Sequence, residues 1–172
     1  MASGTRCQRT CVVVVDGVVQ VIASSVPLHQ RVARNLANRL DEQLPDGLVA
    51  ECDVEVVLQP GARATVCRPD VVVTSAGSYG DGCHRLDAAD VLLAVEVVPP
   101  GSKRADRVTK PMLYAKAGIA RYWVVDLGEP VSLAAFELVG DLYKLVEEGV
   151  GRVELTWPTG FSVDLDRLTR RR

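Results

Sequence analysis

The stretch "AVEVVPPGSKRADRVTK", residues 94–110, decides the fold and raises the first question about function. Residues 91–98 form an apolar run typical of a buried β-strand, yet Glu96 stands inside this run and a basic cluster follows it. An ionised carboxylate in a buried strand costs free energy unless a positive group or a metal ion meets it. The sequence therefore predicts a partner for Glu96, which is either a basic side chain or a bound cation.

The sequence on either side of this stretch predicts further strands and two helices. "VVVVDGVVQVIA", residues 12–23, places two β-branched runs around Asp-Gly, which is the pattern of a β-hairpin. Residues 28–44 carry Leu or Val in steps of four and predict an amphipathic helix with Ser24 or Ser25 as its cap and Pro27 in its first turn. This helix should end at residues 45–47, "PDG".

The remaining elements follow from β-branched runs and turn residues. A second helix is expected with Thr109 as cap, Pro111 in the first turn and Gly118 as the residue that ends it. Strands are expected at residues 52–58, 63–67, 70–74, 91–98 and 121–126, followed by an antiparallel pair at 131–138 and 141–148 that turns at Gly140-Asp141. The order of elements predicts an α/β fold with a mixed central β-sheet flanked by helices.

Length and composition favour one globular domain over residues 1–172, in which we expect residues 1–11 and 167–172 to be flexible and residues 75–90 to form a mobile loop. A net charge of −2 excludes a protein whose whole surface is basic, so any nucleic-acid contact requires a local basic patch. The five cysteines lack the spacing of a disulfide framework or a zinc site and indicate free thiols in a reducing compartment. Since no apolar run approaches a membrane-spanning length, we expect no membrane contact and a cytoplasmic location.

Two acidic residues stand on strands that could be neighbours: Asp70 at the head of one and Glu96 inside another. Paired carboxylates on rigid strands are oxygen ligands of the kind that Mg²⁺ takes while it keeps several waters. Lys103, Arg104, Arg107 and Lys110 follow Glu96, and one of them could reach back to the carboxylates. Spacing alone is weak evidence for such a site, and it favours a structural ion pair of Glu96 with an arginine or lysine over a functional role.

The string "RPDVVV…VLLAVEVVPPGSKRADRVTKPMLYAKAGIARYWVVD", within residues 68–126, resembles the Uma-two family of bacterial restriction endonucleases, a branch of the PD-(D/E)XK nuclease superfamily. The resemblance covers about residues 12–148 and depends on "PD", "VEV", "DR..K", "YA.AGI" and "YW.VD" occurring in this order. It implies a restriction-endonuclease-like core that carries an N-terminal β-hairpin.

The resemblance also implies a site and a reaction. Asp70, Glu96 and the backbone carbonyl of Val97 would hold Mg²⁺ or Mn²⁺, and Lys110 would replace the lysine that most superfamily members carry two residues after the second acid. A metal-bound water would attack a DNA phosphodiester bond, and Lys103, Arg104 and Arg107 would contact the nucleic acid. Restriction-type nucleases are commonly homodimers, so we expect a homodimer here.

Two positions depart from the family pattern. Val13 stands where the family usually has a glutamate, and Pro99 stands where a serine is common. A catalytically degenerate nucleic-acid-binding or protein-interaction module on the same fold is therefore the alternative function.

For several single residues the sequence also allows a structural role. Asp70 can instead cap the turn after Pro69, and Lys110 can be a solvated lysine, with Lys103 as the other candidate for the catalytic lysine. We interpret His29 as packed against or hydrogen-bonded to the sheet. The aromatic residues Tyr114, Tyr122 and Trp123 are interpreted as core.

Overall fold

The computed structural model describes residues 11–15, 17–22, 26–78, 85–100, 104–158 and 160–170. Its helices are α1 (Pro27–Asp41), α2 (Arg104–Lys116) and α3 (Leu165–Thr169), with short 3₁₀ turns η1 (Ala76–Ser78) and η2 (Ala88–Asp90). Its strands are β1 (Cys11–Val15), β2 (Val18–Ile22), β3 (Leu48–Cys52), β4 (Glu55–Gln59), β5 (Thr65–Cys67), β6 (Val71–Ser75), β7 (Arg85–Asp87), β8 (Val91–Val98), β9 (Arg121–Asp126), β10 (Ser132–Val139), β11 (Leu142–Val150), β12 (Arg152–Leu155) and β13 (Phe161–Asp164).

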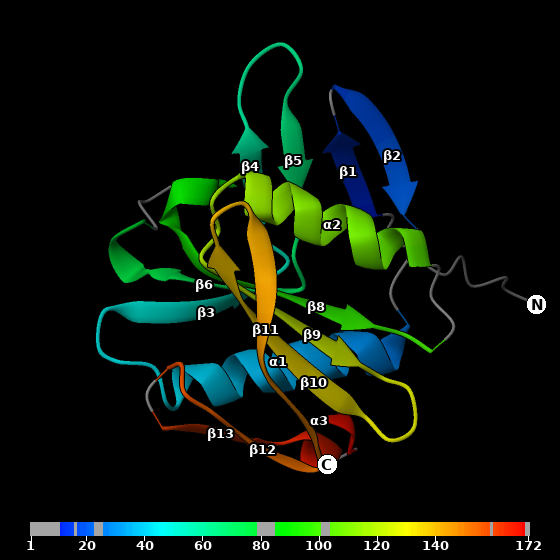
Figure 1. The fold of residues 1–172 in the computed structure, drawn as a ribbon, viewed down its shortest axis with the longest axis vertical. Helices are drawn as coiled ribbons and strands as arrows, with labels where there is room; N and C mark the ends of the chain where they lie inside the picture. The colour runs from blue at the N-terminus through cyan, green and yellow to red at the C-terminus, as the bar shows by residue number, and fades with distance from the viewer. Residues whose placement is uncertain are drawn as a thin grey trace, which may run out of the picture.

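The central sheet has six strands in the order β11-β10-β9-β8-β6-β3. It is mixed, because β8 and β9 run parallel while its other neighbouring strands pair antiparallel. A second sheet, β2-β1-β5-β4-β7, contains the predicted N-terminal hairpin, and β12 pairs with β13. The expected α/β fold with a mixed central sheet is confirmed (Figure 1).

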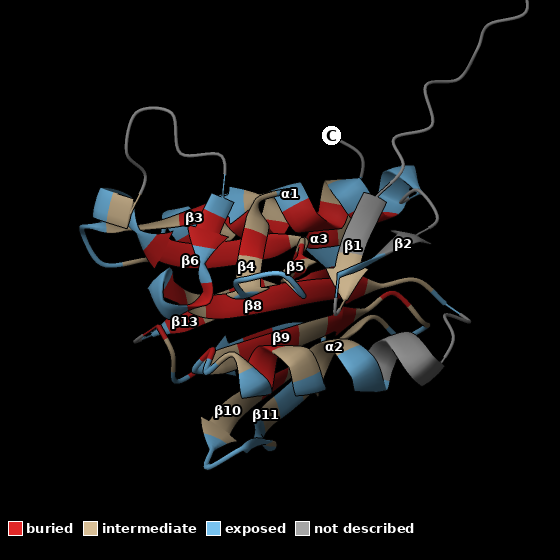
Figure 2. Ribbon diagram, turned by 90° about the horizontal axis from the view of Figure 1, so that it is seen from above, coloured by how far each residue is buried: buried red, intermediate tan, exposed pale blue. Residues whose placement is uncertain are grey.

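Helices cover both faces of the central sheet (Figure 2). On one face, α1 buries Leu36 and Leu40 in a core cluster that includes Val95 and Trp123. On the other face, Tyr114 of α2 belongs to a second cluster. Because side chains alternate along a strand, β8 directs Leu93, Val95 and Val97 towards α1 and Ala94 towards α2. The same alternation brings Glu96 to the α2 side.

The start of α1 differs in part from the expectation. Pro27 lies in the first turn as predicted, but the cap is Val26, which makes no capping hydrogen bond with its side chain. Ser24 and Ser25 lie outside the described residues. The helix ends at Asp41, several residues before the predicted stop, and the carboxylate of Asp41 accepts a hydrogen bond from the backbone N–H of Ala50.

Helix α2 starts at Arg104, so Thr109 lies inside it and the prediction that Thr109 caps the helix is wrong. Pro111 consequently sits in the helix interior, where the missing N–H costs about 3 kcal/mol. Burial of Tyr114 and Ala115 offsets this cost. The predicted end is correct: Gly118 has φ of 79°, donates its N–H to Ala115 O, and is followed by the bond from Ile119 N to Tyr114 O. These two bonds form a Schellman motif.

Two further segments differ from their predictions. The strand expected at residues 52–58 is divided into β3 and β4, because Asp53 adopts φ of 60° and breaks the extended backbone. The expected mobile loop at residues 75–90 contains η1, β7 and η2 in its described parts, while residues 79–84 lie outside them.

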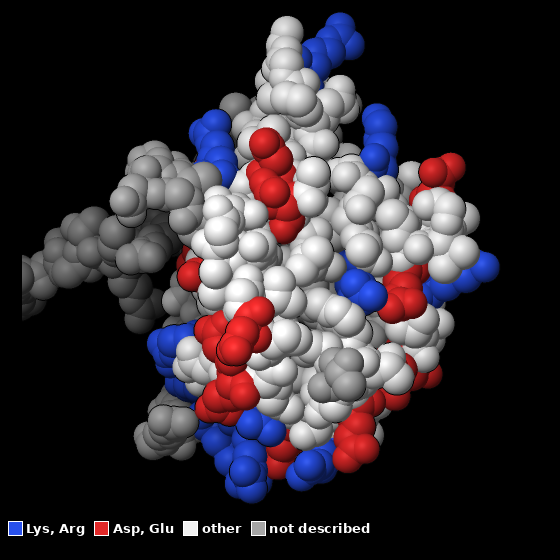
Figure 3. Space-filling view, turned by 90° about the vertical axis from the view of Figure 1, so that its left-hand side faces the viewer, with Lys and Arg blue, Asp and Glu red and all other residues white. Residues whose placement is uncertain are grey.

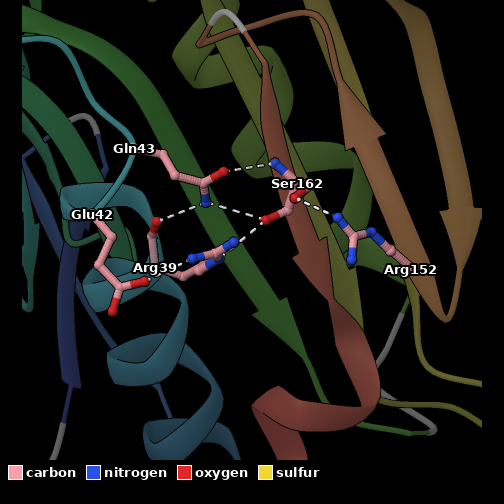
Figure 4. Close-up of polar contacts among 5 residues, drawn as sticks. All are labelled: Arg39, Glu42, Gln43, Arg152 and Ser162. Carbon is pink, nitrogen blue, oxygen red and sulfur yellow. Dashed lines mark hydrogen bonds and ion pairs between the residues drawn. The ribbon is translucent and has the colours of Figure 1, made fainter.

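The C-terminal segment packs on α1 and is not wholly a flexible tail. Residues 165–169 form α3, in which Leu168 is only 4% exposed, so residues 167–169 belong to the folded domain. Gln43, just after the end of α1, donates to the carbonyl of Ser162 and accepts from its N–H, and Arg39 of α1 also donates to this carbonyl (Figure 4). The side-chain amide of Gln43 thus satisfies the backbone N–H and C=O of Ser162, as a neighbouring strand would do.

Acidic and basic side chains are interspersed on the face shown in Figure 3, as the small net charge predicts. Within the part of the chain that the structure describes, no helix is both long and apolar enough to cross a membrane.

Candidate functional site

Glu96 lies on β8 and has two partners on α2. Lys110 Nζ lies 2.6 Å from Glu96 Oε2, and the Tyr114 hydroxyl donates to Glu96 Oε1 at 2.6 Å. Lys110 and Tyr114 are four residues apart on one helix, so they share a face and reach the same carboxylate. The Schellman motif that ends α2 fixes the turn containing Tyr114 through the bond from Ile119 N to Tyr114 O.

Asp70 precedes β6 and reaches the end of β8. Its backbone N–H donates to Val95 O at 3.0 Å, and its Oδ2 accepts from the N–H of Val97 at 2.8 Å. The start of β6 lies beside the end of β8 because these two strands pair antiparallel. The side chain of Asp70 is therefore held at the strand end that also carries Glu96.

His29, in the first turn of α1, is the second partner of Asp70. Its Nε2 lies 3.1 Å from Asp70 Oδ2, and its side chain is 9% exposed. Its Nδ1 is buried and has no hydrogen-bond partner within the described part of the chain. Helix α1 thus contributes a charge partner to the site, and His29 is hydrogen-bonded at the sheet, in agreement with the structural interpretation of this residue.

Burial and neighbouring charges shift the pKa values of the site. Burial, opposed by Lys110 and assisted by the negative charge of Asp70, raises the pKa of Glu96 to about 7. Burial alone would lower the pKa of Lys110, but the Glu96 carboxylate outweighs it and the pKa is raised. Burial also acts to lower the pKa of His29, but its bond to Asp70 and the charges of Asp70 and Glu96 raise it. Both basic groups are thus favoured in their charged forms.

The donor chemistry of the site fits a divalent cation. Asp70 and Glu96 place two carboxylates near each other, and their mutual repulsion contributes to the raised pKa of Glu96. Asp70 Oδ1 accepts no hydrogen bond among the described residues, so one carboxylate oxygen is available. The described residues contain no group of three or more His, Cys, Asp or Glu side chains arranged to hold a metal. Mg²⁺ does not need such a group, since it binds through one or two carboxylates and retains waters.

The structure brings together most of the residues that the sequence predicts for the site. Asp70, Glu96, Val97 and Lys110 meet where β6, β8 and α2 converge. Lys110, whose side chain is 21% exposed, contacts Glu96 and is not a solvated lysine. Lys103 and the side chains of Arg104 and Arg107 lie outside the described residues. The side chain of Val13 also lies outside them, although the backbone of Val13 pairs with Gln20.

Sequence reasoning missed the contacts of two residues. Tyr114 is fully buried, as a core residue should be, yet its hydroxyl donates to the Glu96 carboxylate. Its position four residues after Lys110 was the available signal. For His29 a hydrogen bond at the sheet was expected but its partner was not, because the contact with Asp70 joins residues far apart in the chain.

Comparisons with known proteins agree with this fold. A crystal structure of a "putative nuclease belonging to DUF820" from Anabaena variabilis ATCC 29413 has a TM-score of 0.67 and 11% sequence identity, and the match covers 92% of this chain and 89% of that one. Such a likeness at low identity shows the fold. No curated protein gives a match. The family described as "Uma2: Putative restriction endonuclease" matches residues 8–168. Since this match spans nearly the whole chain, the protein belongs to the Uma2 family.

Proposed function

We propose that the protein is a Mg²⁺- or Mn²⁺-dependent endonuclease that hydrolyses DNA phosphodiester bonds. The observation that carries this proposal is the convergence of Asp70, Glu96 and Lys110 at the end of two adjacent strands. Membership of a family described as a restriction endonuclease supports the reaction class.

Asp70, Glu96 and the carbonyl of Val97 would hold the cation. When bound, the cation would lower the pKa of a water and neutralise charge on the phosphate. The protein's own residues prepare this arrangement: Tyr114 and Lys110 fix the two oxygens of Glu96, while His29 and the Val97 N–H fix Asp70 Oδ2. A carboxylate held in this way loses little freedom when it binds a ligand.

Lys110 acts as a positive charge in this proposal. Because its pKa is raised by the Glu96 carboxylate, its amine stays protonated at neutral pH and does not accept a proton in this state. The ammonium group lies where it can orient a water or a phosphate oxygen beside the carboxylates. Lys103 is the other lysine that could take this role.

The test combines metal binding with cleavage. Mn²⁺ is titrated by calorimetry into the wild type, the Asp70→Asn/Glu96→Gln double variant and an Asp90→Asn control, which removes an exposed carboxylate at the other end of β8. We expect binding by the wild type and the control and none by the double variant. The same proteins are then assayed on plasmid and single-stranded DNA with Mg²⁺ and Mn²⁺. A wild type that leaves both substrates uncut with either metal contradicts the proposal.

A binding module on the same fold is the second candidate. It is favoured by the contacts of the carboxylates, since both oxygens of Glu96 and one oxygen of Asp70 already have protein partners. Salt-sensitive DNA binding that persists in the double variant and in the presence of a chelator would support this candidate. Metal-dependent turnover that the double variant loses would exclude it.

A homodimer and a cytoplasmic location are further parts of the proposal. A nuclease that cuts both strands of a duplex needs two active sites, and two copies of the chain would supply them. Sedimentation of the purified protein with and without duplex DNA tests this part, and a monomer under both conditions contradicts it.

A further inference from the structure

A pocket of about 210 Å³ opens beside the carboxylate site. Its lining comes from the first half of α1 and from the junction of β3 with β4, and Asp70 belongs both to the pocket and to the candidate site. The lining residues are His29, Gln30, Ala33, Arg34, Cys52, Asp53 and Asp70. We call this cavity the α1 pocket. Because Gln30, Arg34 and Asp53 are exposed, the pocket is accessible from the surface.

Two oppositely charged side chains line the α1 pocket without meeting each other. Within the described part of the chain, neither Arg34 nor Asp53 makes a hydrogen bond or an ion pair, with each other or with any other residue. Asp53, which directly follows β3, is also the only described residue other than glycine with positive φ, at 60°. Aspartate tolerates such backbone better than most residues, but it remains uncommon. The pocket thus presents an unpaired donor and an unpaired acceptor.

The lining suits a neutral ring with polar edges better than it suits a phosphate. Two acids, Asp53 and Asp70, and two basic residues, His29 and Arg34, line the cavity, and His29 is already paired with Asp70, so the pocket offers no excess of positive charge to attract a phosphate. Ala33 and Cys52 add apolar surface, and burial raises the pKa of the Cys52 thiol to about 11, which keeps it neutral. Gln30 supplies both a donor and an acceptor.

We propose that the α1 pocket binds one nucleobase of the nucleic acid substrate, next to the phosphate that reaches Asp70 and Glu96. Base edges carry hydrogen-bond donors and acceptors side by side, which arginine and acidic side chains recognise. The pocket is smaller than those that hold drug-sized ligands, and this size fits a single base. The nucleic-acid class of the ligand rests on the proposed function.

This assignment has a consequence for the form of the substrate. A base enters a pocket on the protein only after it leaves the stacked duplex, and unstacking costs a few kcal/mol unless the strand is already single or mismatched. The protein therefore prefers single-stranded or locally unpaired DNA to a continuous duplex. The preference comes from the α1 pocket and not from the carboxylates.

The experiment is a titration of the isotopically labelled full chain followed by amide NMR, in the presence of a chelator. The probes are thymidine, deoxycytidine, deoxyguanosine and deoxyadenosine, compared with deoxyribose 5-phosphate, which carries the phosphate and sugar without a base. We expect at least one nucleoside to shift amides of residues 29–34 and 52–53, and deoxyribose 5-phosphate to leave them unchanged. In Arg34→Ala the affinity for that nucleoside should fall at least tenfold, roughly the loss of one good polar contact.

Arg63→Ala is the matched control, because Arg63 is an exposed arginine of the β4–β5 turn that does not line the pocket. This variant should bind the nucleoside like the wild type. The inference is overturned if no nucleoside shifts these amides, if deoxyribose 5-phosphate shifts them as strongly, or if both arginine variants lose affinity equally. Since no metal is present, the outcome is independent of cleavage. If the protein cleaves DNA but binds no nucleoside, only the inference about the α1 pocket is contradicted. If it binds a nucleoside but does not cleave DNA, only the proposed reaction is contradicted.

Discussion

Lys110 Nζ lies 2.6 Å from Glu96 Oε2, and this ion pair joins α2 to β8, a largely buried strand of the central sheet. The Glu96 side chain is 7% exposed, so water contributes little to its solvation. Lys110 and the Tyr114 hydroxyl therefore supply most of its polar partners in the metal-free protein. The stability of this region and the proposed chemistry therefore depend on the same three side chains.

Replacement of Lys110 by Met should destabilise the metal-free protein by about 3 kcal/mol, because it leaves a buried carboxylate without its countercharge. The measurement is chemical denaturation at about pH 8, where Glu96 of the wild type, with a pKa of about 7, is mostly ionised. The double variant Lys110→Met/Glu96→Gln should recover part of the loss, since it removes the uncompensated charge. A loss below about 0.5 kcal/mol in the single variant would show that the pair contributes no more than an exposed one.

Tyr114→Phe removes one hydroxyl without changing the packing volume appreciably. The bond from Tyr114 lowers the pKa of Glu96, so its loss should raise that pKa further above its value of about 7. NMR titration of the Glu96 carboxyl carbon measures this change. Tyr143→Phe is the control, because the Tyr143 hydroxyl donates to the carbonyl of Ile119 and not to the site. An unchanged Glu96 titration in Tyr114→Phe contradicts the assigned contact.

The pair of His29 and Asp70 predicts a pH dependence of stability. The folded-state pKa of His29 is raised above the ordinary value of 6.5, so its contribution is fully present below that pH and is lost as the pH rises through the folded value. When the pH rises from about 6 to about 8, the wild type should therefore lose more unfolding free energy than His29→Gln. Each kcal/mol of this difference should appear as an additional fall of about 3 °C in the Tm of the wild type. Parallel melting profiles for the two proteins would show that His29 is not stabilised in its charged form.

Gly118→Ala tests the end of α2. Gly118 has φ of 79°, and an added Cβ would meet nothing within 4 Å, so the substitution imposes backbone strain without a clash. We expect a loss of about 1 kcal/mol in unfolding free energy. Gly77→Ala is the control, because Gly77 lacks positive φ and its added Cβ makes only an ordinary contact with Ser75. Equal losses in the two variants would contradict this account of the Schellman motif.

The sequence alone predicted the elements whose pattern is local. Residues 91–98 form β8 with the predicted bounds, and the β10–β11 pair turns at Gly140 as expected. The motif order also identified Asp70, Glu96 and Lys110, which the structure places together. Periodicity and turn residues act over a few positions, so a sequence displays them directly.

Local rules failed in two places. Thr109 and Pro111 are typical of a helix start, yet α2 begins five residues earlier, at Arg104, because residues 104–108 contain no glycine or proline and so continue the helix backwards. Residues 167–172 were expected to be a flexible basic tail, but residues 165–169 form α3, and Leu165 and Leu168 pack into the core.

Only the tertiary structure decided how the site is held. Two features join segments that are remote in sequence. One is the contact of His29 with Asp70, and the other is the α1 pocket, which has Arg34 and Asp53 in its lining. Such contacts depend on the antiparallel pairing of β6 with β8 and on the angle at which α1 crosses the sheet, and neither is encoded in a short pattern. The sequence therefore determined which charged groups the protein carries, while the packing of helices on the sheet determined which of them neutralise one another and where a ligand can enter.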